Sequence, residues 1–272
     1  MTTPDVPLRF EFTIEVPGPP EQVWDALATA NGISSWMMPT DGEEGLGGTL
    51  VFHMGEGEGE SSPAEITAWE RPTRVAYIEP DWATLMGQDK DAAVTPLATE
   101  FLVEATSGGT CIVRVVTSAF GTGADWEQEF FDEMGKGWTP FFQHLRLYLT
   151  HFPGQTVTPF NVVAEKKGSA EVVLSAMRDA LGLADGNIQV SAHGLEGEVE
   201  GEVDRLSDAH HMLLRLGGSV PGYLALYAYD RGDGVTGANV SGYLFSDGAP
   251  AYVDRARVQW QAWHDALTVP AS

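Results

Sequence analysis

The chain has 272 residues, 43% of them hydrophobic, which is enough for two domains of ordinary size, each with its own core. Fifteen basic and thirty-nine acidic side chains give a formal net charge of −24 at pH 7. This charge repels phosphate backbones and therefore argues against nucleic acid as a partner. No run of eighteen apolar residues is present, so the sequence predicts no membrane span.

The cysteine content and the N-terminus indicate the compartment. Cys111 is the only cysteine, so no internal disulfide can form. The first ten residues lack the basic start and apolar core of a secretory signal. Because chains without disulfides are usual in a reducing compartment, we expect a cytoplasmic protein.

The first half of the chain predicts a strand, a helix and then a meander of strands. Residues 8–16 alternate as a strand, and the turn at residues 17–20 (Pro-Gly-Pro-Pro) leads into a helix over residues 21–29. A second short helical piece, residues 31–38, ends before Pro39. Strand signals follow at residues 48–54, 64–69, 74–79, 98–105 and 110–118.

The longest predicted helix covers residues 125–151 and closes the first half. Its apolar residues recur at three- and four-residue steps: Trp126, Phe130, Met134, Trp138, Phe141, Phe142, Leu145 and Leu149. Gly135 and Gly137 interrupt this helix, and each costs roughly 1 kcal/mol of helix propensity relative to Ala. We therefore expect a kink there, or a close approach of the helix to the sheet or to a ligand.

The opening of the chain is repeated 150 positions later, where residues 160–177 follow the pattern of residues 10–27. Identical pairs are Phe10/Phe160, Glu15/Glu165, Gly18/Gly168, Glu21/Glu171, Val23/Val173 and Ala26/Ala176. The second half predicts a helix over 169–181, strands near 187–192, 197–205, 211–216, 222–229 and 238–245, and a last helix over 251–267. We therefore expect two tandem domains, residues 1–154 and 155–272, the second being a divergent copy without a counterpart of the Trp36-Met37-Met38 segment.

This order of elements is that of an α+β helix-grip fold, an antiparallel curved sheet wrapped on a long C-terminal helix, here in two tandem copies. Five stretches resemble the START-like SRPBCC superfamily, and within it the C-terminal domain type of heat-shock-protein-90 ATPase activators: PPEQVWDALATANGISSWM, GLGGTLVFHM, AEITAWERPTRVAYIEPDW, EFLVEATSGGTCIVRVVTSAF and GWTPFFQHLRLYL. The resemblance covers residues 9–152 and implies a cavity between sheet and helix that binds a hydrophobic small molecule. The separate N-terminal domain of the eukaryotic activators has no counterpart in this sequence, so their chaperone-activating role is not carried over.

Side chains that face such a cavity follow from periodicity. Alternation places Phe101 and Val103 on one face of their strand, and Val115 inward on the next. The predicted ligand-binding residues are Trp36, Met37, His53, Trp69, Tyr77, Phe101, Val115, Trp138 and Phe142. Each could instead be an ordinary core residue, but a buried indole N–H or phenol O–H needs a hydrogen-bond partner, which favours the tryptophans and Tyr77 as lining residues.

Motifs for catalysis or for metal binding are absent from the sequence. It contains no nucleophile elbow, no P-loop and no His/Cys cluster with metal-ligand spacing, so we predict no metal and no cofactor. His53 and Tyr77 are the candidates for acid–base chemistry, although a lone histidine on a strand is more often structural. Glu56, Glu58 and Glu60 alternate with glycine and predict a solvated hairpin tip at the cavity mouth.

Three functions are compatible with these features. The first is non-enzymatic binding of an apolar or amphipathic small molecule in the first domain, with the second domain serving structure or protein contact. The second is a START-like cyclase, dehydratase or hydrolase, which requires His53 and Tyr77, or an acid such as Glu65, to converge on the cavity. The third is a co-chaperone or regulatory module with a protein partner, for which we expect a large apolar patch on the outer surface.

Overall fold

The computed structural model divides into two compact units, residues 1–154 and 155–272. It describes residues 5–54, 61–85, 87–89, 92–183, 189–192, 199–204, 211–218 and 220–270. The predicted hairpin tip at Glu56, Glu58 and Glu60 lies outside the described residues, as do parts of the strands predicted near 187–192 and 197–205.

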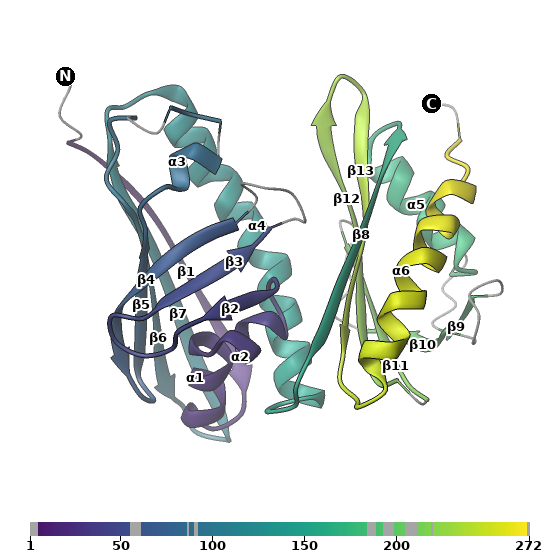
Figure 1. The fold of residues 1–272 in the computed structure, drawn as a ribbon, viewed down its shortest axis with the longest axis horizontal. Helices are drawn as coiled ribbons and strands as arrows, with labels where there is room; N and C mark the ends of the chain where they lie inside the picture. Colours follow the sequence, from purple (N-terminus) through teal and green to yellow (C-terminus); the bar gives the residue numbers. More distant parts are fainter. Residues whose placement is uncertain are drawn as a thin grey trace. The chain divides into compact units, whose positions relative to one another are not determined.

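The described residues of the first unit form a seven-stranded antiparallel sheet (Figure 1). Its strands are β1 (Val6–Pro17), β2 (Thr40–Gly42), β3 (Thr49–His53), β4 (Ser61–Glu70), β5 (Arg74–Glu79), β6 (Leu97–Ala105) and β7 (Thr110–Gly121). They lie in the order β1-β7-β6-β5-β4-β3-β2, so the first strand pairs with the last and the others form a meander. In this pairing Val6 is opposite Gly121 and Pro17 is opposite Thr110.

The helices of the first unit are α1 (Pro20–Ala28), α2 (Ala30–Ser34), α3 (Trp82–Leu85) and α4 (Asp125–His151). Figure 1 shows α4 running along one face of the curved sheet. The turn before α4 is held by the Glu127 carboxylate, which accepts hydrogen bonds from the backbone N–H groups of Thr122 (3.0 Å), Gly123 (2.9 Å) and Ala124 (3.2 Å). Burial alone would raise the pKa of Glu127, but these hydrogen bonds lower it below its ordinary value, which keeps the carboxylate charged at the helix N-terminus.

The two glycines inside α4 have different surroundings. A Cβ built on Gly135 would lie 2.9 Å from Cε2 of Phe10, so the helix approaches β1 too closely there for a side chain. A Cβ built on Gly137 would meet no atom within 4 Å. The close approach expected from the sequence is therefore found at Gly135, whereas Gly137 leaves open space.

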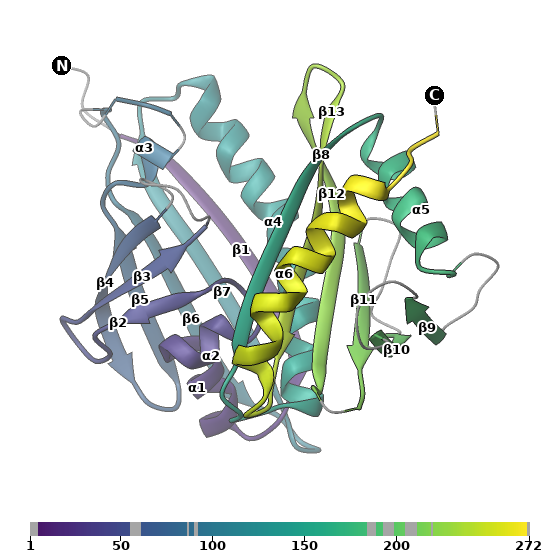
Figure 2. The same ribbon diagram turned by 45° about the vertical axis from the view of Figure 1, so that its right-hand side comes forward.

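The described residues of the second unit form a six-stranded antiparallel sheet in the order β8-β13-β12-β11-β10-β9. The strands are β8 (Thr158–Lys167), β9 (Gln189–Ala192), β10 (Val199–Val203), β11 (His211–Leu216), β12 (Gly222–Gly232) and β13 (Val235–Leu244). The helices α5 (Ala170–Ala180) and α6 (Ala249–Ala266) pack on one face of this sheet, around a core that includes Met177, Leu224 and Trp260 (Figure 2). The end of α6 is held by Lys166, whose Nζ donates to the backbone carbonyls of His264 and Leu267.

The two units repeat one topology, as the sequence predicts. Gly18 and Gly168 both follow the first strand of their unit and have φ values of +113° and +122°, a region open to glycine because it has no Cβ. The N–H of Gly18 donates to the carbonyl of Gly109 (3.0 Å), and that of Gly168 donates to Gly234 (3.3 Å). In each unit the acceptor lies in the last hairpin. The expected fold class, α+β with tandem antiparallel curved sheets each closed by a C-terminal helix, is confirmed.

The described residues bear on two kinds of partner, membranes and metal ions. None of the helices there combines the length and the apolar character needed to cross a membrane. Within the same residues, no three His, Cys, Asp or Glu side chains gather in a way that could hold a metal ion.

Cys111 is buried, and its thiol donates to the carbonyl of Gly18 at 3.4 Å.

Candidate ligand-binding site

A cavity of about 220 Å³ lies between the sheet and α4 in the first unit. Four methionines contribute to its wall: Met37, Met38, Met54 and Met134. Six aromatic residues form most of the remaining wall: Phe52, Tyr77, Trp82, Phe130, Trp138 and Phe141. Met54 is 46% exposed and stands at the rim. Such a wall suits an apolar occupant, because methionine side chains adapt their shape and aromatic rings offer large flat surfaces.

A layer of aromatic packing lies behind the wall and fixes its rings. Trp138 stacks on Phe142 with ring centroids 5.3 Å apart and meets Phe101 edge-on at 5.8 Å. Phe142 in turn stacks on Phe12 at 5.0 Å and on Trp36 at 6.0 Å. This layer joins α4 to β1 and β6, and it leaves Trp138 little freedom to rotate.

Polar groups enter the cavity from two adjacent strands. Tyr77 and Glu79 on β5 and Thr99 on β6 line it. The hydroxyl of Ser62 donates to Oε2 of Glu79 at 2.5 Å. Burial raises the pKa of Glu79, and the bond from Ser62 only partly opposes this. Burial and the nearby Glu79 charge raise the pKa of Tyr77 well above its ordinary value, against a smaller lowering by Thr99. The site therefore contains a carboxyl group that gains a proton more readily than usual.

Trp138, which lines the cavity with other atoms of its ring, has a fully buried indole N–H. Trp138 is only 8% exposed, and its Nε1 has no hydrogen-bond partner among the residues that the structure describes. The other buried tryptophans of this unit donate to backbone carbonyls: Trp24 to Arg74 (3.2 Å), Trp36 to Ala26 (2.8 Å) and Trp82 to Thr95 (2.9 Å). Trp138 thus differs from them in having a buried donor that the described protein does not satisfy.

Three of the nine predicted ligand-binding residues line the cavity: Met37, Tyr77 and Trp138. The structure places Trp36, Phe101 and Phe142 in the aromatic layer behind them. Val115 is fully buried on β7, opposite Phe101 in the β6–β7 register, and does not line the cavity. Trp69 lies elsewhere, edge-on against Trp24 of α1 at 4.7 Å.

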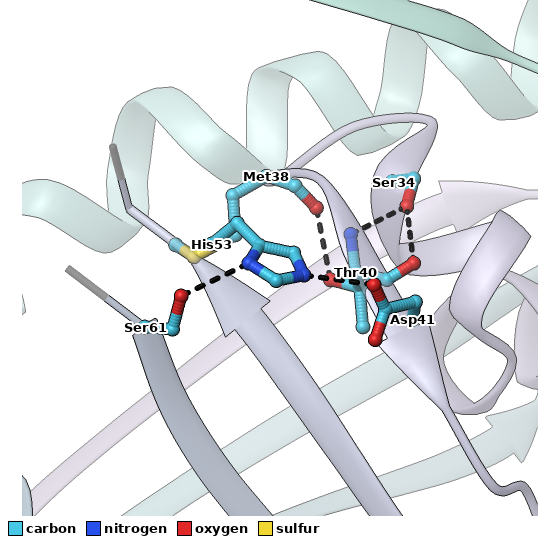
Figure 3. A network of polar contacts seen from close by, with 6 residues as sticks. All are labelled: Ser34, Met38, Thr40, Asp41, His53 and Ser61. Atoms are coloured by element: carbon cyan, nitrogen blue, oxygen red, sulfur yellow. Dashed lines mark hydrogen bonds and ion pairs between the residues drawn. The ribbon is translucent and has the colours of Figure 1, made fainter. Parts of the chain in front are cut away.

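His53 lies on β3 between two residues that line the cavity, Phe52 and Met54, so strand alternation directs it to the opposite face. Figure 3 shows its ring between Asp41 and Ser61. His53 Nε2 lies 2.9 Å from Asp41 Oδ2, and Nδ1 lies 3.0 Å from Ser61 Oγ. This contact network links β2, β3 and β4, and it lies outside the cavity.

Neighbouring contacts fix the methionine segment of the wall. Thr40 Oγ1 donates to the carbonyl of Met38 at 2.9 Å, and the Thr40 N–H donates to Ser34 Oγ at 2.8 Å (Figure 3). From the helix side, Nδ1 of His144 lies 3.1 Å from the carbonyl of Trp36. The segment that carries Met37 and Met38 is therefore fixed by Thr40 on its C-terminal side and by His144 of α4 on its N-terminal side.

Glu79 is a cavity residue that the sequence reasoning missed. Glu65, the acid considered there, is exposed on β4, between the buried Ala64 and Ile66. The signal for Glu79 was present, because alternation along β5 places it on the same face as Tyr77, two residues earlier.

Comparisons with known proteins give one family match. Residues 7–145, slightly more than half of the chain, match the sequence profile of the family described as "Polyketide cyclase / dehydrase and lipid transport". A comparison with curated proteins found no match.

Several solved structures are similar to this chain at low identity. The di-domain ARO/CYC BexL from the BE-7585A biosynthetic pathway is 11% identical over 96% of each chain, with a TM-score of 0.44. Protein MLL2253 from Mesorhizobium loti is 23% identical over 53% of this chain and 98% of its own, with a TM-score of 0.43. The Aha1 dimer from Colwellia psychrerythraea is 19% identical over 52% of this chain and 96% of its own, with a TM-score of 0.40.

Proposed function

Because this chain belongs to the polyketide cyclase, dehydrase and lipid transport family, we propose that its first unit binds an apolar small molecule in the cavity between the sheet and α4. The observation that carries the proposal is the wall of methionine and aromatic side chains. A ligand that buries ~200 Å² of apolar surface gains about 5 kcal/mol at roughly 25 cal/mol per Å², before the entropy of association is subtracted.

The size of the cavity limits the ligand. A dry cavity of about 150 Å³ suffices for benzene. The 220 Å³ found here accommodates a larger molecule, with the dimensions of two fused rings. Because methionine has three rotatable bonds and no branch, the wall adapts to ligands of different outline. We therefore expect binding of a range of compact apolar compounds.

Gly137 provides a direct test of this proposal. It lines the cavity, and a Cβ there meets no atom within 4 Å, so Gly137→Leu places a side chain in the open space whereas Gly137→Ala adds one methyl group. 1-Aminonaphthalene, a two-ring compound whose emission shifts to shorter wavelength in apolar sites, should bind the wild type and Gly137→Ala similarly. Gly137→Leu should bind it at least tenfold more weakly, with an unchanged circular dichroism spectrum. Equal binding by all three proteins would place the probe elsewhere and contradict the proposal.

Native mass spectrometry of the purified protein addresses the natural ligand. A molecule that is retained by the native protein, released by organic solvent and lost in Gly137→Leu would identify the chemical class of the ligand.

Acid–base catalysis on the bound molecule is a second candidate, and it is favoured by Tyr77 and Glu79 in the same cavity. A carboxyl group with a raised pKa in an apolar site can donate a proton, as dehydration requires. The extracted ligand, incubated with wild type and with Glu79→Gln, separates the alternatives: loss of water only with the wild type supports catalysis, and unchanged ligand with both supports binding alone. A protein partner stays a prediction.

A further inference from the structure

We propose that the cavity of the first unit takes a hydrophobic organic cation. The apolar body of this ligand lies against the methionine and aromatic wall, and its tertiary or quaternary ammonium group lies beside the carboxylate of Glu79. This inference rests on the proposed function and narrows it, because it replaces an apolar ligand of any kind by one that carries a positive charge.

The lining of the cavity carries charge at one position. Among the described residues that line it, Glu79 is the one acidic side chain, and none is Lys, Arg or His. No described cation neutralises Glu79, and burial raises its pKa against the smaller effect of the bond from Ser62. By contrast, Glu70 and Glu100 of the same sheet are both paired with Arg74. A ligand cation would therefore be the counter-ion that the described residues do not supply.

The carboxyl group of Glu79 is oriented before any ligand arrives. The hydroxyl of Ser62, a buried residue, donates to Oε2 of Glu79 at 2.5 Å. Glu79 itself is half-buried, so the group is fixed by the protein and still open to contact. A fixed carboxylate loses little conformational entropy on binding, which favours association. A tertiary ammonium group adds a charge-assisted hydrogen bond, whereas a quaternary group binds through its charge alone.

Aromatic rings lie beside this carboxylate. Phe52 is opposite Ser62 in the β3–β4 register, and its ring centroid lies 5.1 Å from that of Tyr77. Tyr77 and Glu79 lie on the same face of β5, two residues apart, and both line the cavity. The faces of aromatic rings attract cations, and this attraction is strongest where water is excluded. Rings and a carboxylate at one place are therefore suited to an organic ammonium ion.

The charge of the whole chain acts in the same direction. A formal net charge of −24 attracts cations to the protein and repels carboxylates and phosphates. Inside the cavity, an anionic ligand would share an apolar space with Glu79, without a counter-ion among the described lining residues. Both effects favour a cation over an anion of the same size.

Three compounds of similar size and different charge test the inference. Benzyltrimethylammonium is the cation, neopentylbenzene is its neutral isostere with carbon in place of nitrogen, and 3-phenylpropionate is an anion. Affinities for the full-length protein are measured by calorimetry and by displacement of 1-aminonaphthalene, which is uncharged at neutral pH. At about pH 8, where the Glu79 carboxyl is charged, the wild type should bind the cation at least as tightly as neopentylbenzene and should not bind the anion.

Glu79→Gln keeps the shape of the side chain and removes its charge. It should weaken binding of the cation by roughly tenfold or more and leave binding of neopentylbenzene unchanged. Glu65→Gln is the matched control, because Glu65 is exposed on β4 of the same sheet and does not line the cavity. This control removes the same charge from the chain and should change the affinity for the cation by less than about twofold.

The pH dependence of binding is a second readout that needs no variant. A quaternary ammonium has no proton to lose, so any change with pH comes from the protein. Because Glu79 gains a proton more readily than usual, the affinity of the wild type for the cation should fall as the pH is lowered from about 8 to about 5, by up to roughly tenfold per pH unit. Tyr77, the other titratable lining residue, stays neutral over this range because its pKa is raised well above its ordinary value. Neopentylbenzene should show no such fall.

The outcomes separate this inference from the proposed function. If the wild type binds neopentylbenzene but not the cation, or if Glu79→Gln and Glu65→Gln affect the cation alike, the charge contact is refuted while apolar binding stands. If none of the three compounds and no 1-aminonaphthalene binds the wild type, the proposed function fails and the inference fails with it.

Discussion

Replacing the two glycines of α4 by alanine, one at a time, should stabilise the first unit at Gly137 but not at Gly135. Both residues lie inside one helix, two positions apart, and both substitutions add a single methyl group. They differ in what the new Cβ meets: open space at Gly137, and the ring of Phe10 at Gly135.

The size of the two effects follows from these surroundings. Alanine is favoured over glycine inside a helix by about 1 kcal/mol, and this gain applies at both positions. At Gly137 nothing within 4 Å opposes it. At Gly135 the Cβ would lie 2.9 Å from Cε2 and 3.0 Å from Cδ2 of Phe10, so the ring has to move. Overpacking of this kind costs about 1–3 kcal/mol, so Gly135→Ala should be neutral or destabilising.

Urea unfolding followed by tryptophan fluorescence measures the difference. Six of the eight tryptophans belong to the first unit, so the signal reports mainly on it. Gly137→Ala should raise the unfolding midpoint, Gly135→Ala should lower it or leave it unchanged, and the slopes should be equal. Equal stabilisation by both substitutions would refute the close approach of α4 to Phe10.

Three further predictions concern buried side chains. Because burial raises the pKa of Glu79 above its ordinary 4.5, the stability that its protonated form provides is complete below that value and is lost as the pH rises through the folded pKa. As the pH rises through the folded pKa of Glu79, the free energy of unfolding of the wild type should therefore fall relative to that of Glu79→Gln, by up to about 1.4 kcal/mol per pH unit. Thermal melts at a series of pH values measure this difference, and parallel pH profiles of the two proteins would contradict the raised pKa. Burial, together with the charge of Lys166, lowers the pKa of His264 from 6.5 to about 4. The stability of α6 should therefore decrease by up to about 3 kcal/mol as the pH falls from 6.5 to about 4. Hydrogen exchange over residues 249–266 measures this loss, which should be absent in His264→Leu. Phe142→Ala should cost the first unit about 3–5 kcal/mol, because Phe142 is fully buried; a loss below 1 kcal/mol in urea unfolding would show that the aromatic layer is not well packed.

The sequence predicted long elements better than short ones. The bounds of β5 and α4 were predicted correctly, because residues 74–79 alternate and residues 125–151 carry a continuous apolar stripe. The elements β2 and α3 have three and four residues, too few to show a period, and they were missed. The family membership and the fold confirm the resemblance to the START-like SRPBCC superfamily.

The site was harder to predict, because periodicity gives the face of an element but not the depth of a residue. Trp138 and Phe142 are four residues apart on one face of α4, yet Trp138 lines the cavity and Phe142 lies behind it. On β3, His53 was placed near the cavity, but its position between Phe52 and Met54 directs it to the other face. Glu79 was passed over because a charged residue is usually assigned to solvent. Whether the predicted residues bind a ligand stays a prediction.

The pairing of β1 with β7 also determines how this protein can be made. Val6 of β1 is paired with Gly121 of β7, so the ribosome has to synthesise more than a hundred further residues before this end of β1 can pair. In the second unit Thr158 of β8 likewise cannot pair until Leu244 of β13 has been synthesised. Contacts so distant along the chain form slowly, and partly synthesised chains expose apolar strands meanwhile. Each unit therefore becomes stable only when its last strand and closing helix have been synthesised, and a chain that ends before residue 110 has no partner for β1.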